Sequence, residues 1–296
     1  MIMSDPFFDE IPKLRRGDQF HATWKRFCKN RLAVVGLCIF LVILFVALFS
    51  GFFIPYQRAL EQNLAVRNQL PSAEHWFGTD NYGRDIFCRI MHGARYSLLT
   101  GIGAVAVGIV CGGLLGALAG FKGGWLDTII MRSTDTLLCI PFMLLVLALV
   151  AALGTSLRNV LIALMLAMLP TYARVIRSAV LTVVGADYIE AATACGASSW
   201  RIILRHVLPN AIGPIIVQAT MTVGTMIIWA AGISFLGMGI QPPTPEWGAM
   251  LSEGKNYITT TPHLVLFPGL AIAITAFSLN LMGDGLRDAL DPRLKD

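Results

Sequence analysis

The sequence predicts an all-α polytopic protein that crosses a membrane six times. Of its 296 residues, 55% are hydrophobic and only 14% are charged, whereas about a quarter of a typical soluble domain is charged. A helix needs about 20 mostly apolar residues to span a bilayer. The apolar stretches place the six spans at residues 32–53, 96–118, 135–154, 160–180, 211–237 and 264–283.

The first predicted span follows a basic segment, residues 1–31. This segment carries seven cations, Lys13, Arg15, Arg16, Lys25, Arg26, Lys29 and Arg31. A cleavable signal peptide would begin nearer the terminus and end at a small-residue cleavage site. We therefore expect the first helix to stay in the membrane and residues 1–31 to be cytoplasmic.

The second predicted span contains a glycine at every fourth position. Gly108, Gly112, Gly116 and Gly120 lie along one helical stripe, where a second backbone can approach closely. The pattern predicts tight helix packing. A smooth surface on which helices slide is the alternative interpretation.

Lys and Arg residues predict the orientation of the spans. Most of the 23 fall in segments on one side of the membrane when the amino terminus is cytoplasmic, as the positive-inside tendency requires. Six spans then place both termini in the cytoplasm. The predicted outer loops are residues 54–95 and 238–263.

The predicted cytoplasmic loop between the fourth and fifth spans, residues 182–209, is too long to lack structure of its own. Asp187 and Glu190 suit the first turn of a helix, and Gly196 can end it. Ser198 or Ser199 can cap a second helix that continues to Pro209. Small alanines on the first helix would let it enter a groove of another protein, so the loop is predicted to be a mechanical coupling element.

This loop resembles the EAA loop of ABC importer permeases. The resemblance is carried by Glu190, Ala191, Ala192, Gly196, Leu208 and Pro209. His206 departs from the pattern, which often has an aliphatic residue there. In that family the loop forms the coupling helix, which docks on a nucleotide-binding subunit.

Three further motifs are similar to dipeptide, oligopeptide and nickel permeases. A GTDxxGRD-like signature comprises Gly78, Thr79, Asp80, Gly83, Arg84 and Asp85. Residues 241–248 and 280–288 resemble the second, C-type (DppC/OppC-like) permease subunit. From the residues themselves we expect Thr79 or Asp80 to cap a short outer helix and Arg84 or Asp85 to pair locally, a structural role rather than contact with substrate.

The resemblance implies that residues 32–296 form a type I ABC importer (MetI-like) transmembrane domain in the bacterial cytoplasmic (inner) membrane. Its implied partners are a B-type permease subunit, two ATP-binding subunits and an extracytoplasmic solute-binding protein. Peptides are the expected cargo, with nickel chelates, glutathione or antimicrobial peptides as alternatives. ATP and Mg would belong to the partner subunits, so no cofactor, metal or catalytic residue is expected in this chain.

Two rival classes lack the residues that they need. An ion-coupled secondary transporter would carry ionisable groups within its spans, and the predicted spans have almost none. An intramembrane enzyme would need a catalytic or metal cluster at depth, but all five histidines lie outside the span centres. The six cysteines form no CxxC pair. Polar candidates for lining a pathway are Gln218, Thr222, Thr225 and Asn280, for which interhelical hydrogen bonding is the alternative role.

Overall fold

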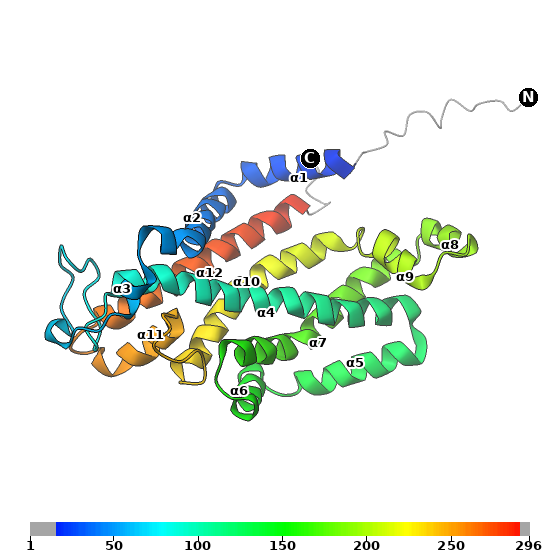
Figure 1. Ribbon diagram of the computed structural model, residues 1–296. Helices are drawn as coiled ribbons and strands as arrows, with labels where there is room; N and C mark the ends of the chain where they lie inside the picture. The colour runs from blue at the N-terminus through cyan, green and yellow to red at the C-terminus, as the bar shows by residue number, and fades with distance from the viewer. Residues whose placement is uncertain (1–15, 291–296) are drawn as a thin grey trace, which may run out of the picture.

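The computed structural model describes residues 16–290, which form helices joined mostly by short segments (Figure 1). Four of the cations used to predict orientation, Lys13, Arg15, Arg293 and Lys295, lie outside this range. The α-helices are α1 (Arg16–Lys29), α2 (Arg31–Phe53), α3 (Tyr56–Leu60), α4 (Ile86–Lys122), α5 (Gly124–Leu138), α6 (Phe142–Leu153), α7 (Leu157–Val184), α8 (Asp187–Ala194), α9 (Ser199–Ile202), α10 (Ile212–Phe235), α11 (Trp247–Gly254) and α12 (His263–Leu290). Single turns of other helix types lie at η2 (Leu64–Val66), η3 (Ile203–Val207) and η4 (Lys255–Tyr257).

Five of the predicted spans correspond to single helices that are long and apolar enough to cross a membrane. These are α2, α4, α7, α10 and α12. Helix α4 starts ten residues before its predicted span because Asp85 caps it, accepting a hydrogen bond from the backbone N–H of Cys88.

The predicted third span, residues 135–154, is not one straight helix. Helices α5 and α6 meet there at 90°, and together they supply the sixth apolar segment. Pro141 precedes α6. Because proline lacks an N–H group and disfavours helical geometry in the residue before it, the helix cannot run straight through.

Helices α4 and α7 form the most extensive contact in the bundle. All four glycines of the predicted stripe are buried in it. At Gly112 a Cβ atom would lie only 2.6 Å from the carbonyl oxygen of Leu169 on α7. The predicted tight packing is therefore present, and the sliding alternative stays a prediction.

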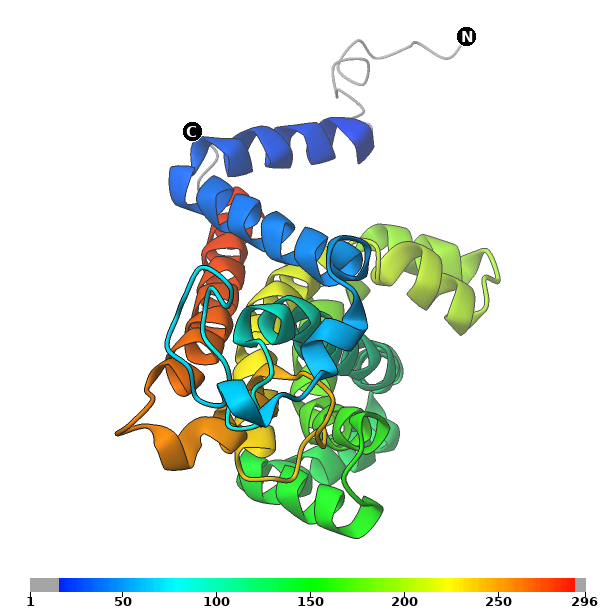
Figure 2. The ribbon, with the colours of Figure 1, turned by 60° about the vertical axis from the view of Figure 1, so that its left-hand side comes forward.

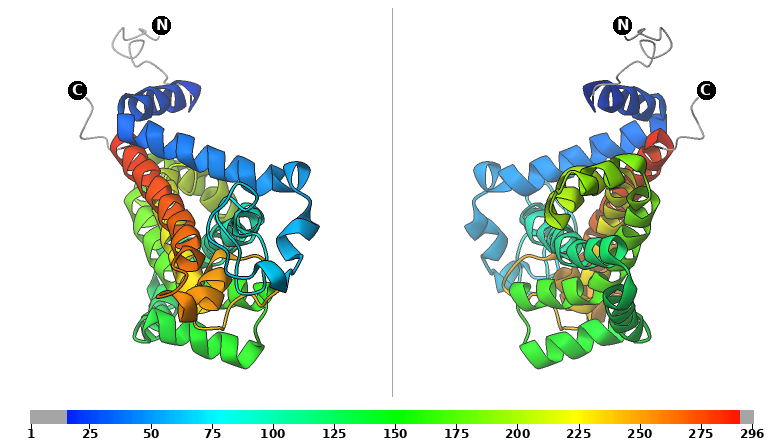
Figure 3. Two further views of the ribbon diagram at one scale, coloured as in Figure 1. Left: turned by 90° about the vertical axis from the view of Figure 1, so that its left-hand side faces the viewer. Right: turned by 90° about the vertical axis from the view of Figure 1, so that its right-hand side faces the viewer.

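The bundle has two ends of different character. At one end, which we call the α11 end, α3, α11 and the long segment between α3 and α4 gather together. At the other, the α8 end, α8 and α9 project beyond the long helices (Figure 1), and they lie toward the viewer in the right-hand view of Figure 3. Helix α1 lies across the carboxyl-terminal part of α12 and the start of α2 (Figure 2).

Candidate functional site

The predicted helix–turn–helix is present at the α8 end. Helix α8 begins at Asp187 and carries Asp187 and Glu190 in its first turn. There the positive end of the helix dipole stabilises acidic side chains. Gly196 then takes φ +76°, a left-handed conformation that costs other residues free energy. Its N–H group donates to the carbonyl of Thr193 at 2.9 Å, and the N–H of Ala197 donates to the carbonyl of Ala192 at 3.1 Å. The turn after α8 therefore depends on this glycine.

The second helix of the loop differs from the prediction in detail. Helix α9 spans only Ser199–Ile202 and passes into a π-helical turn at Ile203–Val207. Ser198 occupies the capping position, but its side chain makes no capping hydrogen bond. The π turn widens the helix by one residue per turn, a change that the sequence pattern does not reveal.

A small apolar core attaches the loop to the bundle. Ile189 on α8 and Ile202, Ile203 and Val207 on the second helix are buried against Ile176 and Val180 of α7. This cluster is separate from the main core of the bundle. The loop is therefore packed directly on α7.

The predicted coupling residues divide between two faces of the loop. Glu190, Ala191 and Gly196 are exposed, whereas Ala192, Leu208 and Pro209 are half-buried. The exposed surface also includes Tyr188 and Trp200, which are 45% and 51% exposed. Sequence analysis missed these two aromatics, although large rings in an otherwise small and polar loop are a recognisable signal for a protein contact.

Two ion pairs brace α7 against α5 near the α8 end. Arg177 contacts both carboxylate oxygens of Asp127, at 2.5 and 2.6 Å, and Arg174 contacts Asp135 at 2.6 Å. Asp127 and Arg177 are half-buried, and a two-point contact of this kind fixes orientation as well as distance. The pairing was missed because the partners lie 50 residues apart in sequence.

At the α11 end, the signature residues build a tight loop. Gly78 and Gly83 have φ +77° and +74°, and Thr79 is fully buried. The Thr79 hydroxyl accepts from the N–H of Gln69 at 2.9 Å and donates to the carbonyl of Val66. Asp80 accepts from the backbone N–H groups of Tyr82 and Arg84.

The prediction that Thr79 or Asp80 caps a short outer helix is wrong. The capping residue is Asp85, and the helix is the long α4. The side chains of Thr79 and Asp80 instead form hydrogen bonds with backbone groups of the loop. Asp85 also contacts Nδ1 of His75 at 2.8 Å. The predicted local pairing of Arg84 is confirmed, because its Nε lies 2.6 Å from Asp80.

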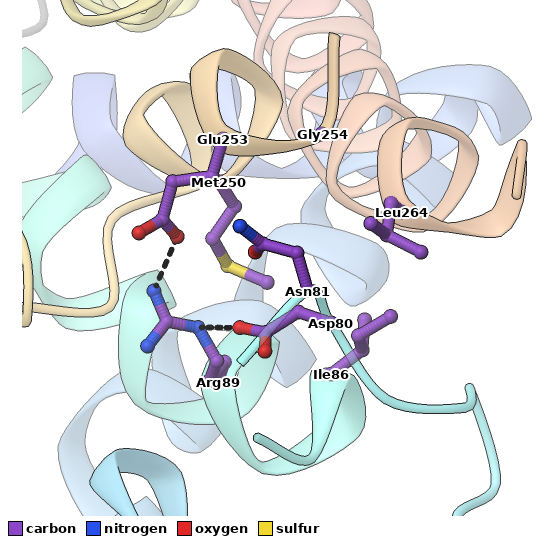
Figure 4. Close-up of a pocket in the computed structure, with 8 residues that line it drawn as sticks. All are labelled: Asp80, Asn81, Ile86, Arg89, Met250, Glu253, Gly254 and Leu264. Atoms are coloured by element: carbon purple, nitrogen blue, oxygen red, sulfur yellow. Dashed lines mark hydrogen bonds and ion pairs between the residues drawn. The ribbon is translucent and has the colours of Figure 1, made fainter. Parts of the chain in front are cut away.

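A buried charge cluster joins this loop to α11. It consists of Asp80, Arg84, Arg89 and Glu253, three of which line a cavity of about 10 Å³ (Figure 4). Arg84 contacts Glu253 at 2.7 Å and Arg89 contacts it at 3.1 Å, while both arginines also face Asp80. Each arginine side chain is only 1% exposed. Such a cluster holds two segments 164 residues apart in one arrangement.

Glu246 is a second buried acid at this end that sequence analysis missed. It caps α11 by accepting from the N–H groups of Gly248 and Ala249, at 2.9 and 2.8 Å, and it accepts a hydrogen bond from Ser97 of α4. Complete burial raises the pKa of its carboxyl, and these hydrogen bonds oppose the shift. Glu246 therefore has structural partners, as do the acids of the charge cluster, which supports a structural role for this end.

The four candidate pathway residues are not brought into one cluster. Gln218 donates to the Thr222 hydroxyl at 3.1 Å, and Thr222 is buried, so these two residues satisfy each other within α10. Thr225 and Asn280 are exposed. Asn280 lies beside Gly224, the neighbour of Thr225. Of the four candidates, only this pair presents polar groups on the outside of α10 and α12.

Metal or nucleophile chemistry finds no support in the geometry. Across residues 16–290, no group of three or more His, Cys, Asp or Glu side chains is placed to hold a metal ion. The charges described above pair with one another and line no large cavity. What the arrangement offers is a projecting helix at one end and a rigid, charge-linked loop at the other.

Comparison with known proteins gives consistent matches. Residues 112–296 match the family described as "binding-protein-dependent transport system inner membrane component", and residues 18–71 match the "N-terminal TM domain of oligopeptide transport permease C". The dipeptide transport system permease protein DppC of Alkalihalophilus pseudofirmus is 47% identical, over 92% of this chain and 89% of the relative. The glutathione transport system permease protein GsiD of Pectobacterium atrosepticum is 44% identical, over 92% of this chain and 90% of the relative.

A solved structure shares the fold. The inward-facing MetNI methionine ABC transporter aligns with a TM-score of 0.56 and 21% sequence identity, covering 69% of this chain and 97% of the matched chain. A second crystal form of that transporter aligns with a TM-score of 0.57. The predicted MetI-like arrangement of helices is confirmed.

Proposed function

The chain belongs to the family of binding-protein-dependent transport system inner membrane components, and we propose that it imports small peptides as one of two permease subunits of an ATP-driven transporter. It is a permease subunit of the DppC/OppC-like kind. The observation that carries the mechanism is the projecting helix α8, whose exposed face combines small and acidic residues with the ring of Tyr188.

Small peptides are the substrate class that the relatives support best. One relative is named for dipeptide transport and another for glutathione transport, and glutathione is itself a tripeptide. Glutathione uptake is the second candidate, ahead of nickel chelates and antimicrobial peptides, for which neither of these two relatives is named. Uptake of labelled dipeptide and labelled glutathione into vesicles containing the assembled transporter would separate the two candidates.

The proposed assembly follows from the family. A B-type permease would complete the pathway, two ATP-binding subunits would bind ATP and Mg at the α8 end, and a solute-binding protein would meet the α11 end. This places both termini in the cytoplasm of a bacterium and the coupling loop, residues 182–209, on the same side. The charge-linked loop at the α11 end is suited to docking of a binding protein. Because the loop is already ordered, binding would not have to offset the entropy cost of ordering it.

Coupling is proposed to work by rigid transmission. ATP-driven closure of the partner subunits would displace the groove that holds α8. Because Ile189 and Ile202 pack on α7, the displacement would move α7 and, through the π turn, α10. The braces from Arg174 and Arg177 would make α5 follow. The pathway would then alternate between its outward-facing and inward-facing states.

The experiment that tests this proposal places a bulky cation on the exposed face of α8. Ala191→Arg should leave membrane insertion intact and reduce co-purification of the ATP-binding subunits at least roughly tenfold, since it adds a clash at a closely packed contact. Ser133→Arg is the matched control, because Ser133 is exposed on α5 and outside the proposed contact. Normal recovery of the ATP-binding subunits with Ala191→Arg would contradict the docking of α8.

A further inference from the structure

Helix α1 lies apart from the main bundle and has two unlike faces. Asn30 caps α2 and separates it from α1, accepting from the N–H groups of Leu32 and Ala33. On the inner face of α1, Phe27 is only 4% exposed and packs with Ala33 and Ala289. This contact holds α1 against the ends of α2 and α12 (Figure 2).

An apolar pocket opens beside this contact. It has a volume of about 170 Å³ and is lined by Thr23, Trp24, Phe27, Leu37, Met282 and Leu286, from α1, α2 and α12. An apolar cavity of about 150 Å³ stays dry and accepts a hydrocarbon ligand of the size of benzene. The pocket therefore has room for a stretch of hydrocarbon chain.

Four cations lie within seven residues of sequence, next to the pocket residues Trp24 and Phe27 along the chain. Lys25, Arg26, Lys29 and Arg31 make no ion pair with any acid in the described part of the chain. With 3.6 residues per turn, Lys25 and Lys29 share one face of α1, and Trp24 and Phe27 share another. Helices with this division lie in the interface of a membrane, with their apolar face toward the hydrocarbon.

The position of the pocket agrees with such a depth. Helix α2, which is long and apolar enough to span the membrane, begins at Arg31 directly beside it. Trp24 is 49% exposed and stacks on Phe27, with ring centroids 5.7 Å apart. Tryptophan is enriched at the boundary between hydrocarbon and headgroups. In a bilayer spanned by α2, the pocket would face acyl chains and the cations would lie near the phosphate groups.

We propose that this pocket binds an acyl chain of an anionic phospholipid, whose headgroup contacts Lys25, Arg26, Lys29 and Arg31. The occupant is argued from charge complementarity, because cations near a membrane surface attract anionic lipid. The apolar pocket matches the acyl chain of such a lipid, and the cations match its anionic headgroup. The site is independent of peptide transport and of α8.

The test uses the fluorescence of Trp24 in the full-length chain in lipid vesicles. Phosphatidylcholine vesicles would contain a minority of phosphatidylglycerol, with bromine near the glycerol end of the acyl chains of either one lipid or the other. Bromine quenches tryptophan on contact. The difference between the native chain and Trp24→Phe isolates the Trp24 signal from the other tryptophans. We expect roughly twofold more quenching per brominated chain when bromine is on phosphatidylglycerol.

A pair of charge variants decides the origin of this preference. Lys25→Gln with Lys29→Gln should reduce the preference for phosphatidylglycerol, because two of the four cations are removed, whereas Lys122→Gln with Arg132→Gln, two exposed cations of the α4–α5 region, should leave the preference intact. Equal quenching by both lipids in the native chain would overturn the proposal, because the pocket would then take bulk lipid. Absence of quenching by either lipid would overturn it as well, since protein would cover the pocket.

Discussion

At the scale of single residues, Gly196 shows how conformation alone can make a position specific. No atom lies within 4 Å of the place where its Cβ would be, so a larger residue would meet no clash. The cost of substitution comes from φ +76°, which is unfavourable by about 1–2 kcal/mol for most residues and less so for asparagine. The glycine therefore acts through the turn that follows α8.

Substitution at Gly196 should separate backbone strain from side-chain size. Gly196→Ala is expected to loosen the turn and raise the rate of limited proteolysis within residues 187–209 by roughly fivefold. Gly196→Asn should raise this rate by less than roughly 2.5-fold, because asparagine adopts positive φ more readily than alanine. Rates would be measured on the purified chain in detergent. If alanine and asparagine behave alike, conformational strain does not control this turn.

Glu253 is the residue on which the charge cluster at the α11 end depends. Glu253→Gln leaves Arg84 paired with Asp80 but removes the carboxylate closest to Arg89. A buried cation without its partner costs about 3 kcal/mol, so we expect a clear fall in the thermal unfolding midpoint. Glu74→Gln on the same loop is the control, because Glu74 is exposed. An unchanged midpoint for Glu253→Gln would show that Asp80 alone satisfies both arginines.

Sequence reasoning at this scale succeeded where a residue's role is local. Gly196 as the end of α8 and Arg84 paired near its own position follow from turn and pairing rules that act over a few residues. Arg89 with Glu253 could not be predicted, because nothing in the sequence brings residues 164 positions apart into contact. The cap of α4 was misassigned because Thr79, Asp80 and Asp85 are all good capping residues and only the loop path selects among them.

At the scale of elements, apolar length predicts spans well and their straightness poorly. Five of the six predicted spans are continuous helices. The sixth breaks at Pro141, where the sequence did carry a signal, since proline inside an apolar run indicates a boundary or a kink. Pro170 within α7 and Pro268 within α12 show why that signal is ambiguous, because both helices continue past their prolines.

The contact of α4 with α7 gives a prediction for elements. Gly112→Ala places a Cβ 2.6 Å from the Leu169 carbonyl, so α7 must move, and we expect a destabilisation of about 2 kcal/mol. Gly51→Ala on α2 is the matched control, because no atom lies within 4 Å of its Cβ position. It should stabilise by about 0.5–1 kcal/mol through helix propensity. The two should shift the thermal midpoint in opposite directions, and a shift in the same direction would contradict this account of the interface.

At the scale of the whole molecule, long apolar helices leave much of their surface uncovered by the rest of the chain. Only 17% of the most apolar stretch of α2 is buried within the chain. Between the charged carboxyl-terminal turns of α12 and the α11 end, the outward residues of α10 and α12 are mainly apolar, and Thr225 and Asn280 are polar exceptions among them. This surface suits a chain that meets lipid on one side and a second permease on the other.

Thiol labelling tests which side of the chain faces lipid and which faces a polar pathway. In a chain whose six native cysteines are replaced by serine or alanine, Thr225→Cys should react with a membrane-impermeant thiosulfonate in the assembled transporter. Leu48→Cys, on the exposed apolar face of α2, should react at least roughly tenfold more slowly, since a thiolate forms poorly away from water. Equal reactivity would contradict a polar pathway beside α10.

The right-angled break between α5 and α6 decides whether the chain crosses the membrane an even or an odd number of times. Helix α6 has 12 residues, which extend about 18 Å, too short to cross a hydrocarbon layer about 30 Å thick. Unless α5 contributes the remaining depth, the chain makes an odd number of crossings and its two ends emerge on opposite faces. A glycosylation acceptor or protease tag inserted at residues 154–156 would therefore report, from one short loop, where the carboxyl terminus must lie.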